Sequence, residues 1–142
     1  MPGIVVDGLH HVSLPVTDLA RSRAFYRDVL GLREIARPGF DFAGAWFALG
    51  AGQLHLIVHP GPSLPTFRDG NAIDSRDVHF AIRVRDFRAA VDRLHELGYR
   101  EDADDPLGRL RVSAHATAGF PQVFLLDPDR HVIELNAASL GD

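Results

Sequence analysis

The sequence predicts an α+β fold in which two βαβββ modules follow one another along the chain. The first observation is an internal repeat. The stretch HVSLPVTDLARSRAFYRDVLGLR, which begins at His11, aligns with HFAIRVRDFRAAVDRLHELGYR, which begins at His79. Asp18 then falls on Asp86, and a one-residue deletion in the second copy keeps the rest in step. The second observation is that strand-like stretches close each half. A repeat of this length indicates a duplicated supersecondary unit.

Each copy of the repeat reads as a strand, then a helix, then a strand. Apolar residues alternate over 11–16 and 79–84 and then recur at helical spacing over 19–30 and 87–97. Carboxylates stand where each helix would begin, and glycines stand where each would end. These start and end residues are Asp18, Asp86, Gly31 and Gly98.

The closing strands of each half are short apolar stretches. They are GAWFALG and QLHLIVH in the first half and PQVFLLD and HVIELN in the second, with DPDR between the last two. DPDR predicts a tight turn, and a stretch rich in proline and glycine at about 60–76 predicts a linker. We therefore expect one domain over 1–142, with module one at about 7–59 and module two at about 77–138.

Composition narrows the classes of partner and site. The formal net charge of −4 argues against a nucleic-acid or anionic membrane partner, because both favour a basic surface. The chain has no cysteine, which excludes disulfides and thiolate metal ligands. It shows neither a signal peptide nor a run of ~20 apolar residues that could cross a bilayer. We expect a cytoplasmic protein.

The last strand of each module places two potential metal ligands at equivalent positions. LHL, residues 54–56, aligns with IEL, residues 133–135, so that His55 in the first half corresponds to Glu134 in the second. His11 and His79 already correspond through the repeat. Four potential donors thus fall on matched positions of a duplicated unit.

Strand alternation also puts these donors on one side. Residues two apart in a strand share a face, so His11, His55, His79 and Glu134 all project from the faces opposite the apolar residues that pack under the helices. His10 has the opposite parity, and we expect it to be a partly buried structural residue.

Three imidazoles and one carboxylate suit a divalent transition metal. Such ligands bind Zn, Ni, Co, Fe or Mn at ~2.0–2.2 Å, whereas a histidine-rich set disfavours Mg and Ca. A single strand histidine is more often a hydrogen-bonded surface or core residue than a ligand. The coincidence of four candidates on matched positions and one face favours a metal site.

The chain resembles the vicinal oxygen chelate superfamily, which includes glyoxalase I, bleomycin-resistance proteins, fosfomycin-resistance enzymes and extradiol dioxygenases. The likeness rests on LHHVSLPVTDLARSRAFYRDVLGL, VHFAIRV and VFLLDPDRHVIEL, and the middle run RPGFDFAGAWFALGAGQLHL is similar to a glyoxalase-I-like subgroup. The resemblance implies a U-shaped mixed sheet with helices outside, cupping a metal that is bound by the first and last strands of each module. It also implies a homodimer, often with each site completed across the subunit interface.

Two positions depart from the family pattern. Glyoxalase I carries a glutamate where this chain has His55, which leaves Glu134 as the sole carboxylate base. The family turn often reads DPDGN, whereas here it reads DPDRH, so Arg130 must accept a turn geometry that suits glycine better.

Three functions remain open at this point. The resemblance favours a metal-dependent glyoxalase-like lyase or isomerase, with Glu134 shuttling a proton on a small oxygenated substrate chelated by the metal. An extradiol-type dioxygenase would use His11, His79 and Glu134 as an iron triad. A third alternative is a non-catalytic protein that binds a small molecule or drug.

Three further side chains are predicted to bind the substrate. Arg83 shares the parity of His79 and could hold an anionic group. Trp46 belongs to the third strand of module one, where either it or Phe47 should face the cavity. Phe42, together with Phe40, is expected in the apolar pocket wall.

Overall fold

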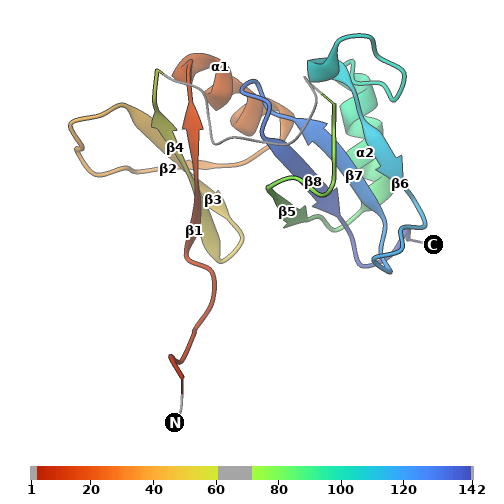
Figure 1. Cartoon of the computed structure of the whole chain (residues 1–142), viewed down its shortest axis with the longest axis horizontal. Coiled ribbons are helices and arrows are strands. Elements are labelled where there is room, and N and C mark those ends of the chain that lie inside the picture. The colour runs from red at the N-terminus through yellow and green to blue at the C-terminus, as the bar shows by residue number, and fades with distance from the viewer. Residues whose placement is uncertain (1–2, 61–71, 142) are drawn as a thin grey trace.

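The fold is the predicted α+β arrangement of two repeated modules, each built on a four-stranded mixed sheet (Figure 1). The computed structural model describes residues 3–60 and 72–141. The first sheet comprises β1 (His11–Val16), β2 (Glu34–Ile35), β3 (Gly44–Leu49) and β4 (Gly52–Val58). The second comprises β5 (His79–Arg83), β6 (Arg111–Ser113), β7 (Gln122–Leu126) and β8 (Val132–Asn136).

Both sheets have the same topology. The strand orders are β1-β4-β3-β2 and β5-β8-β7-β6. In each sheet the first strand runs parallel to the last, and the other neighbours are antiparallel. Parallel neighbours need a crossover, and in each module a helix lies in the chain between them. The repeat in the sequence is therefore a repeat of topology.

The helices begin at the predicted caps. In α1 (Leu19–Ala24) the Asp18 carboxylate accepts the backbone N–H of Arg21 at 3.1 Å. In α2 (Phe87–Glu96) the Asp86 carboxylate accepts that of Ala89 at 3.0 Å. The predicted ends also hold, because both terminal glycines have the left-handed backbone that glycine adopts most easily. They are Gly31 at φ 71° and Gly98 at φ 99°.

The first helix differs from the second in its last turn. After α1 the chain continues as a π-helical stretch, Phe25–Val29, in which the Leu30 N–H donates to the Phe25 carbonyl at 3.1 Å. A π-helical turn accommodates one additional residue in a helix. This turn accounts for the residue by which the first copy of the repeat exceeds the second.

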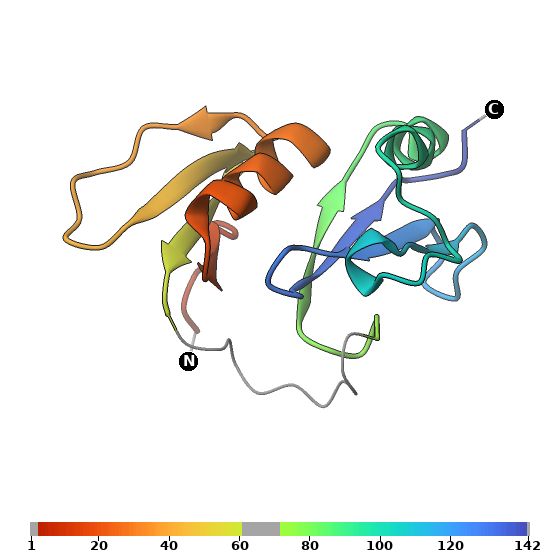
Figure 2. The same ribbon diagram turned by 90° about the horizontal axis from the view of Figure 1, so that it is seen from above.

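The apolar strand faces and the helices form one core that spans both modules. Val16 of β1, Phe25, Phe87 of α2 and Leu125 of β7 belong to the same buried cluster. Figure 2 shows α1 on the side of the first sheet that faces module two. The opposite, open face of the first sheet therefore points away from module two.

A buried polar junction links the modules. The Tyr26 hydroxyl donates to Asp127 Oδ2 at 2.7 Å, and both side chains have no exposed surface. Asp127 Oδ1 accepts the backbone N–H groups of Asp129 and His131, which closes the turn between β7 and β8. Burial raises the pKa of the Asp127 carboxyl, against the lowering effects of His131 and the hydrogen bonds.

Further contacts join the same turn to the end of β1. The Thr17 hydroxyl donates to Asp129 Oδ1 at 2.6 Å, and His131 Nε2 lies 2.7 Å from the Pro15 carbonyl. Arg130 has φ 69°, which confirms that it occupies a position better suited to glycine. A non-glycine residue pays about 1 kcal/mol or more there, so the junction contacts must offset strain in the turn.

The described residues form two separate four-stranded sheets, one in each module, in place of the expected single U-shaped sheet. Within the described ranges, β1 pairs only with β4 and β5 only with β8, which leaves one edge of β1 and of β5 unpaired. Residues 61–71 of the predicted linker lie outside the described residues. The linker residue Ile73 packs against Phe124 and Leu126 of β7. Among the described residues, no helix has the length and apolar character that crossing a membrane requires.

Replacing Tyr26 by phenylalanine should lower the free energy of unfolding by about 1–3 kcal/mol, because it leaves the buried Asp127 Oδ2 without its donor. Urea denaturation followed by circular dichroism measures the change. The matched control is Tyr99→Phe, a half-buried tyrosine whose hydroxyl has no hydrogen-bond partner among the described residues. Equal losses in the two variants would contradict the role of the junction.

Candidate metal centre

The first pair of predicted ligands lies on the open face of the first sheet. His11 in β1 and His55 in β4 stack with their ring centroids 4.1 Å apart and their planes 18° apart. His11 is exposed, whereas His55 retains only 6% of its surface. The contact shows that these two histidines share a face of the sheet, as strand parity predicts.

His10 does not have its predicted position. It is exposed, and its Nδ1 lies 2.8 Å from Nδ1 of His11. β1 begins at His11, and His10 joins the pairing with β4 only through its carbonyl, which accepts the Gln53 N–H at 3.0 Å. The expectation of a partly buried structural histidine is therefore wrong.

Trp46 faces the histidine pair, as predicted for one of the two aromatic residues of β3. It lies opposite His55 in the antiparallel register, with the ring centroids 3.9 Å apart and the planes 3° apart. The imidazole of His55 is thus held between the indole and His11. Phe47 is fully buried in the core.

The surroundings of His55 disfavour protonation of its ring. Burial is the largest cause of a lowered His55 pKa, followed by the charges of His11, His10 and Arg37. A metal binds the neutral imidazole, so the shift favours ligation at neutral pH. Gln53 Oε1 accepts a hydrogen bond from His55 Nε2 at 2.8 Å, so either Nδ1 is the ligand nitrogen or Gln53 must move.

The second pair lies in the second sheet. His79 Nε2 of β5 is 3.3 Å from Glu134 Oε1 of β8, and Glu134 retains only 4% of its surface. His79 Nδ1 lies 2.8 Å from the Asp77 carbonyl, which can only accept, so Nδ1 carries the ring proton. In the neutral ring the Nε2 lone pair therefore faces a carboxylate oxygen.

Two acceptors that face each other need a cation or a proton between them. Two ligand atoms that share one transition-metal ion lie roughly 3.0–3.4 Å apart for bond angles between octahedral and tetrahedral values. The 3.3 Å separation falls within that range. Metal-bound histidines also commonly donate their second ring N–H to a carbonyl or carboxylate, as His79 does. The pair therefore fits a divalent ion.

The second oxygen of Glu134 is fixed by a neighbouring amide. Asn136 Nδ2 donates to Glu134 Oε2 at 2.5 Å, and Arg83 Nε donates to Asn136 Oδ1 at 2.6 Å. Arg83 thus turns the amide so that its NH₂ group faces the carboxylate. Arg83 occupies the predicted face, and its guanidinium also lies 5.2 Å from the Phe120 ring.

Sequence reasoning missed Gln53, Asn136 and Asp77. Gln53 and Asn136 are both amides two residues from the donor in the last strand of their module, and strand parity could have identified them. Asp77 acts through its backbone carbonyl, which no side-chain pattern reveals. Phe42, predicted as a pocket wall, is 42% exposed and stacks on Phe40.

A single chain does not assemble the four predicted donors. Among the described residues, no group of three or more metal-ligand side chains lies close enough to hold one ion. The donors form two pairs, one on each sheet, because α1 lies between the first sheet and module two (Figure 2). The expectation of one four-donor cluster needs this correction for the isolated chain.

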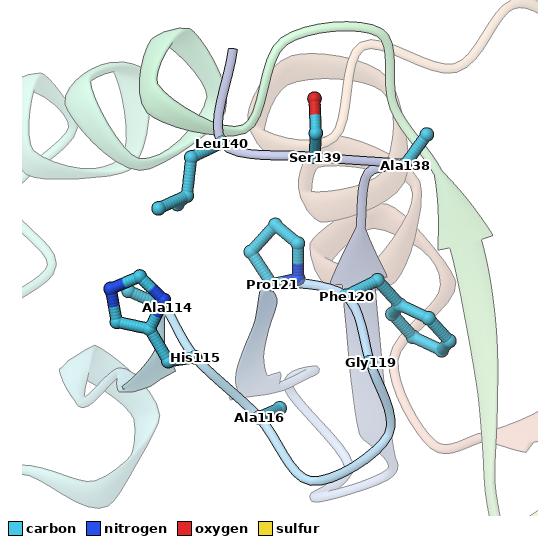
Figure 3. Close-up of a pocket in the computed structure, with 9 residues that line it drawn as sticks. All are labelled: Ala114, His115, Ala116, Gly119, Phe120, Pro121, Ala138, Ser139 and Leu140. Carbon is cyan, nitrogen blue, oxygen red and sulfur yellow. The ribbon is translucent and has the colours of Figure 1, made fainter.

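One hollow of about 370 Å³ lies apart from these pairs. It opens between the 114–121 loop and the C-terminal residues 138–140 (Figure 3). Among the described residues that line it, His115 is the only one with a titratable side chain, and the ring of Phe120 points away from it in Figure 3. The hollow contains none of the predicted ligands.

A family model covers most of the chain. Residues 8–135 match the model of the Glyoxalase/Bleomycin resistance protein/Dioxygenase superfamily. The chain belongs to this superfamily. Its resemblance to the vicinal oxygen chelate proteins is thereby confirmed.

Known proteins resemble the chain over nearly its whole length. The fosfomycin resistance protein FosX of Listeria monocytogenes is 26% identical over 97% of this chain and 95% of its own. The glutathione transferase FosA of Serratia marcescens is 26% identical over 96% of this chain and 85% of its own.

Solved structures show the same fold at lower identity. A mutant of Listeria FosX, in complex with Mn(II) and 1S,2S-dihydroxypropylphosphonic acid, has a TM-score of 0.68 and 17% identity over 96% of this chain and 95% of its own. A bleomycin-binding protein in complex with bleomycin has a TM-score of 0.66 and 20% identity over 93% of this chain and 98% of its own.

The fluorescence of Trp46, the only tryptophan, should report the protonation of His55 in metal-free protein. An imidazolium in contact with an indole quenches its emission, so emission should fall on acidification. The midpoint should lie below the ordinary histidine pKa of 6.5, because burial and nearby positive charge disfavour the protonated ring. A pH titration of the emission measures this.

His55→Leu should abolish the acid quenching, whereas His115→Leu, in an exposed loop, should retain it. A midpoint at or above 6.5, or an unchanged curve for His55→Leu, would show that another group controls the emission.

Proposed function

We propose that the protein is a metal-dependent enzyme that acts on a small oxygenated substrate. The observation that carries the proposal is the contact of His79 with Glu134, in which an imidazole lone pair and a carboxylate oxygen stand 3.3 Å apart. His11 and His55 provide two further imidazoles on the open face of the other sheet. A divalent ion bound by this set supplies Lewis acidity that stabilises negative charge on a substrate oxygen.

The chain's own groups would divide the remaining work. Glu134 Oε2 is held by Asn136, which leaves Oε1 to contact the ion or to take a proton. Asp77 fixes the proton of His79 on Nδ1. Trp46 shields one side of His55 from water. These contacts restrict the donors before a substrate arrives, which lowers the cost of organising the site.

We infer that the site is completed by a second copy of the chain. The unpaired edges of β1 and β5 carry one histidine each. Large apolar side chains beside these histidines are open to solvent: Leu9 is 77% exposed and Val78 is 79% exposed. The arm before β1 adds Ile4 at 94%, Val5 at 88% and Val6 at 76%.

Exposed apolar residues and free strand edges are typical of surfaces that another chain covers. In a two-fold dimer, His11 and His55 of one subunit would meet His79 and Glu134 of the partner subunit, and each dimer would contain two such sites.

Two reaction types fit such a site. The first is a glyoxalase-like lyase or isomerase reaction, in which Glu134 moves a proton next to a substrate carbonyl. The second is inactivation of a fosfomycin-like phosphonate, which the similarity to FosX and FosA favours. The imidazole of His55 in place of a second carboxylate also suits the second reaction, because it leaves one carboxylate base and more positive charge near an anionic substrate.

An activity panel separates these reactions and the remaining alternatives. The protein, loaded in turn with Mn²⁺, Zn²⁺, Ni²⁺ and Fe²⁺, is assayed with the hemithioacetal of methylglyoxal and with fosfomycin. Oxygen uptake with catechol tests the dioxygenase alternative. Tight binding of bleomycin without turnover of any substrate would identify a sequestering protein.

The purified protein should contain one divalent ion per chain. His11→Ala and Glu134→Ala should each weaken metal binding about a hundredfold or more, since even loss of a group that only supports a ligand costs about 10–100-fold. Elemental analysis and metal titration measure this, and His115→Ala is the matched control because His115 is an exposed histidine outside both pairs. Full metal content in Glu134→Ala would place the ion elsewhere.

Mixing the two variants tests the shared site. If each site uses two subunits, refolding His11→Ala together with Glu134→Ala should restore about a quarter of the wild-type metal, because half of randomly paired dimers are mixed and each has one intact site. If each site lies within one chain, mixing restores none. Absence of recovery in a mixture that forms dimers would overturn the shared arrangement.

A further inference from the structure

We propose that Arg37, Phe40, Phe42 and Trp46 form an anion-binding aromatic wall that selects substrates carrying a negatively charged group on a flat, aromatic body. The proposal rests on the proposed function, because it assigns the substrate class of that site. The four side chains come from β3 and from the segment between β2 and β3.

Arg37 is held in place at this wall. Its Nη2 donates to the Phe42 carbonyl at 2.7 Å, and its guanidinium carbon lies 4.7 Å from the Phe40 ring centre and 5.1 Å from that of Phe42. A side chain at Gly44 would collide with the Leu56 carbonyl and approach Arg37 Nε to 3.1 Å. Glycine thus lets the guanidinium press against the β3 backbone.

The charge of Arg37 is not balanced within the described chain. No carboxylate there forms an ion pair with it, and its buried Nε has no hydrogen-bond partner among the described residues. A fixed cation without an anion is costly in a partly buried position. A bound anion would compensate the charge through the guanidinium N–H groups that the Phe42 carbonyl does not occupy.

The wall is continuous with the proposed ligand pair. The Phe42 ring stacks on Phe40 at 5.0 Å, and Phe40 lies 6.1 Å from Trp46. Trp46 in turn stacks on His55. A ligand bound along this row of rings would therefore lie next to His55.

The exposed rings define the body of the ligand. Phe40 is 45% exposed and Phe42 is 42% exposed, so each retains ring surface that a bound molecule could contact, although the two rings also stack on each other and lie under Arg37. Stacking against such faces favours flat, unsaturated groups, and the guanidinium favours a carboxylate or phosphonate on the same molecule. An aromatic phosphonate or carboxylate satisfies both requirements, whereas a neutral ring or a small anion satisfies one.

The test compares three probes by calorimetric titration of the purified protein, with Trp46 emission as a second reading. Phenylphosphonate provides both features, methylphosphonate only the charge, and benzyl alcohol only the ring. We expect saturable binding of phenylphosphonate. Methylphosphonate and benzyl alcohol should each bind at least about tenfold more weakly than phenylphosphonate, a difference of about 1.4 kcal/mol in binding free energy. Equal affinity for all three would overturn the proposal.

Variants locate the binding to the wall. Arg37→Gln should weaken phenylphosphonate binding about tenfold or more, while Arg37→Lys, which keeps the charge but not the planar fork, should be intermediate. Phe40→Leu should reduce the preference for phenylphosphonate over methylphosphonate. The matched control is Arg93→Gln, since among the described residues the Arg93 side chain forms an ion pair only with the exposed Glu96 on α2. Wild-type affinity in Arg37→Gln would overturn the proposal.

Metal content and mass are measured on the same samples, so that the two proposals fail separately. Normal metal content without selectivity for phenylphosphonate would remove the wall but leave the enzyme proposal intact. Selective, Arg37-dependent binding in a protein that takes up no metal would overturn the enzyme proposal but leave the wall intact. Dissociation of a dimer by Arg37→Gln or Phe40→Leu, with unchanged probe affinity, would make the wall a subunit contact and overturn the proposal.

Discussion

The arrangement of the two modules depends on the buried hydrogen bond between Tyr26 and Asp127 and on the turn that Asp127 closes. This contact joins the π-helical end of α1 to the loop between β7 and β8. It fixes the helical side of module one against module two. The consequence reaches the site, because the donor face of the first sheet is then directed away from module two, which is why we propose that a second copy of the chain completes it.

Each half of the candidate site has its own supporting contacts. In the first sheet, His55 lies between two rings and against the amide of Gln53. In the second, His79 is fixed by a backbone carbonyl and Glu134 by the amide of Asn136. Neither half supplies enough ligands for a transition metal, but each is ordered without one. If the proposed ion binds, a preorganised half-site loses less conformational entropy on binding it.

Sequence reasoning found what depends on local period and missed what depends on tertiary placement. Alternation and repetition identified the α+β modules, the helix caps at Asp18 and Asp86, and the faces of His11 and His79. They did not reveal that the two faces separate within one chain, since parity assigns a side to each strand and says nothing of how two sheets meet. The misplacement of His10 has a similar cause, because a pattern of letters does not show where strand pairing begins.

The parallel pairing of β1 with β4 also bears on how the chain is made. On the ribosome, the first strand emerges long before its only neighbour within the described chain, and it must wait for the helix, the hairpin and residues 52–58 before its ladder can close. The same delay recurs for β5, whose neighbour β8 follows only after α2, β6 and β7. A nascent chain thus carries an open, partly apolar strand edge until β4, and later β8, has been translated and has paired. During these intervals chaperones and premature association compete for the exposed edge.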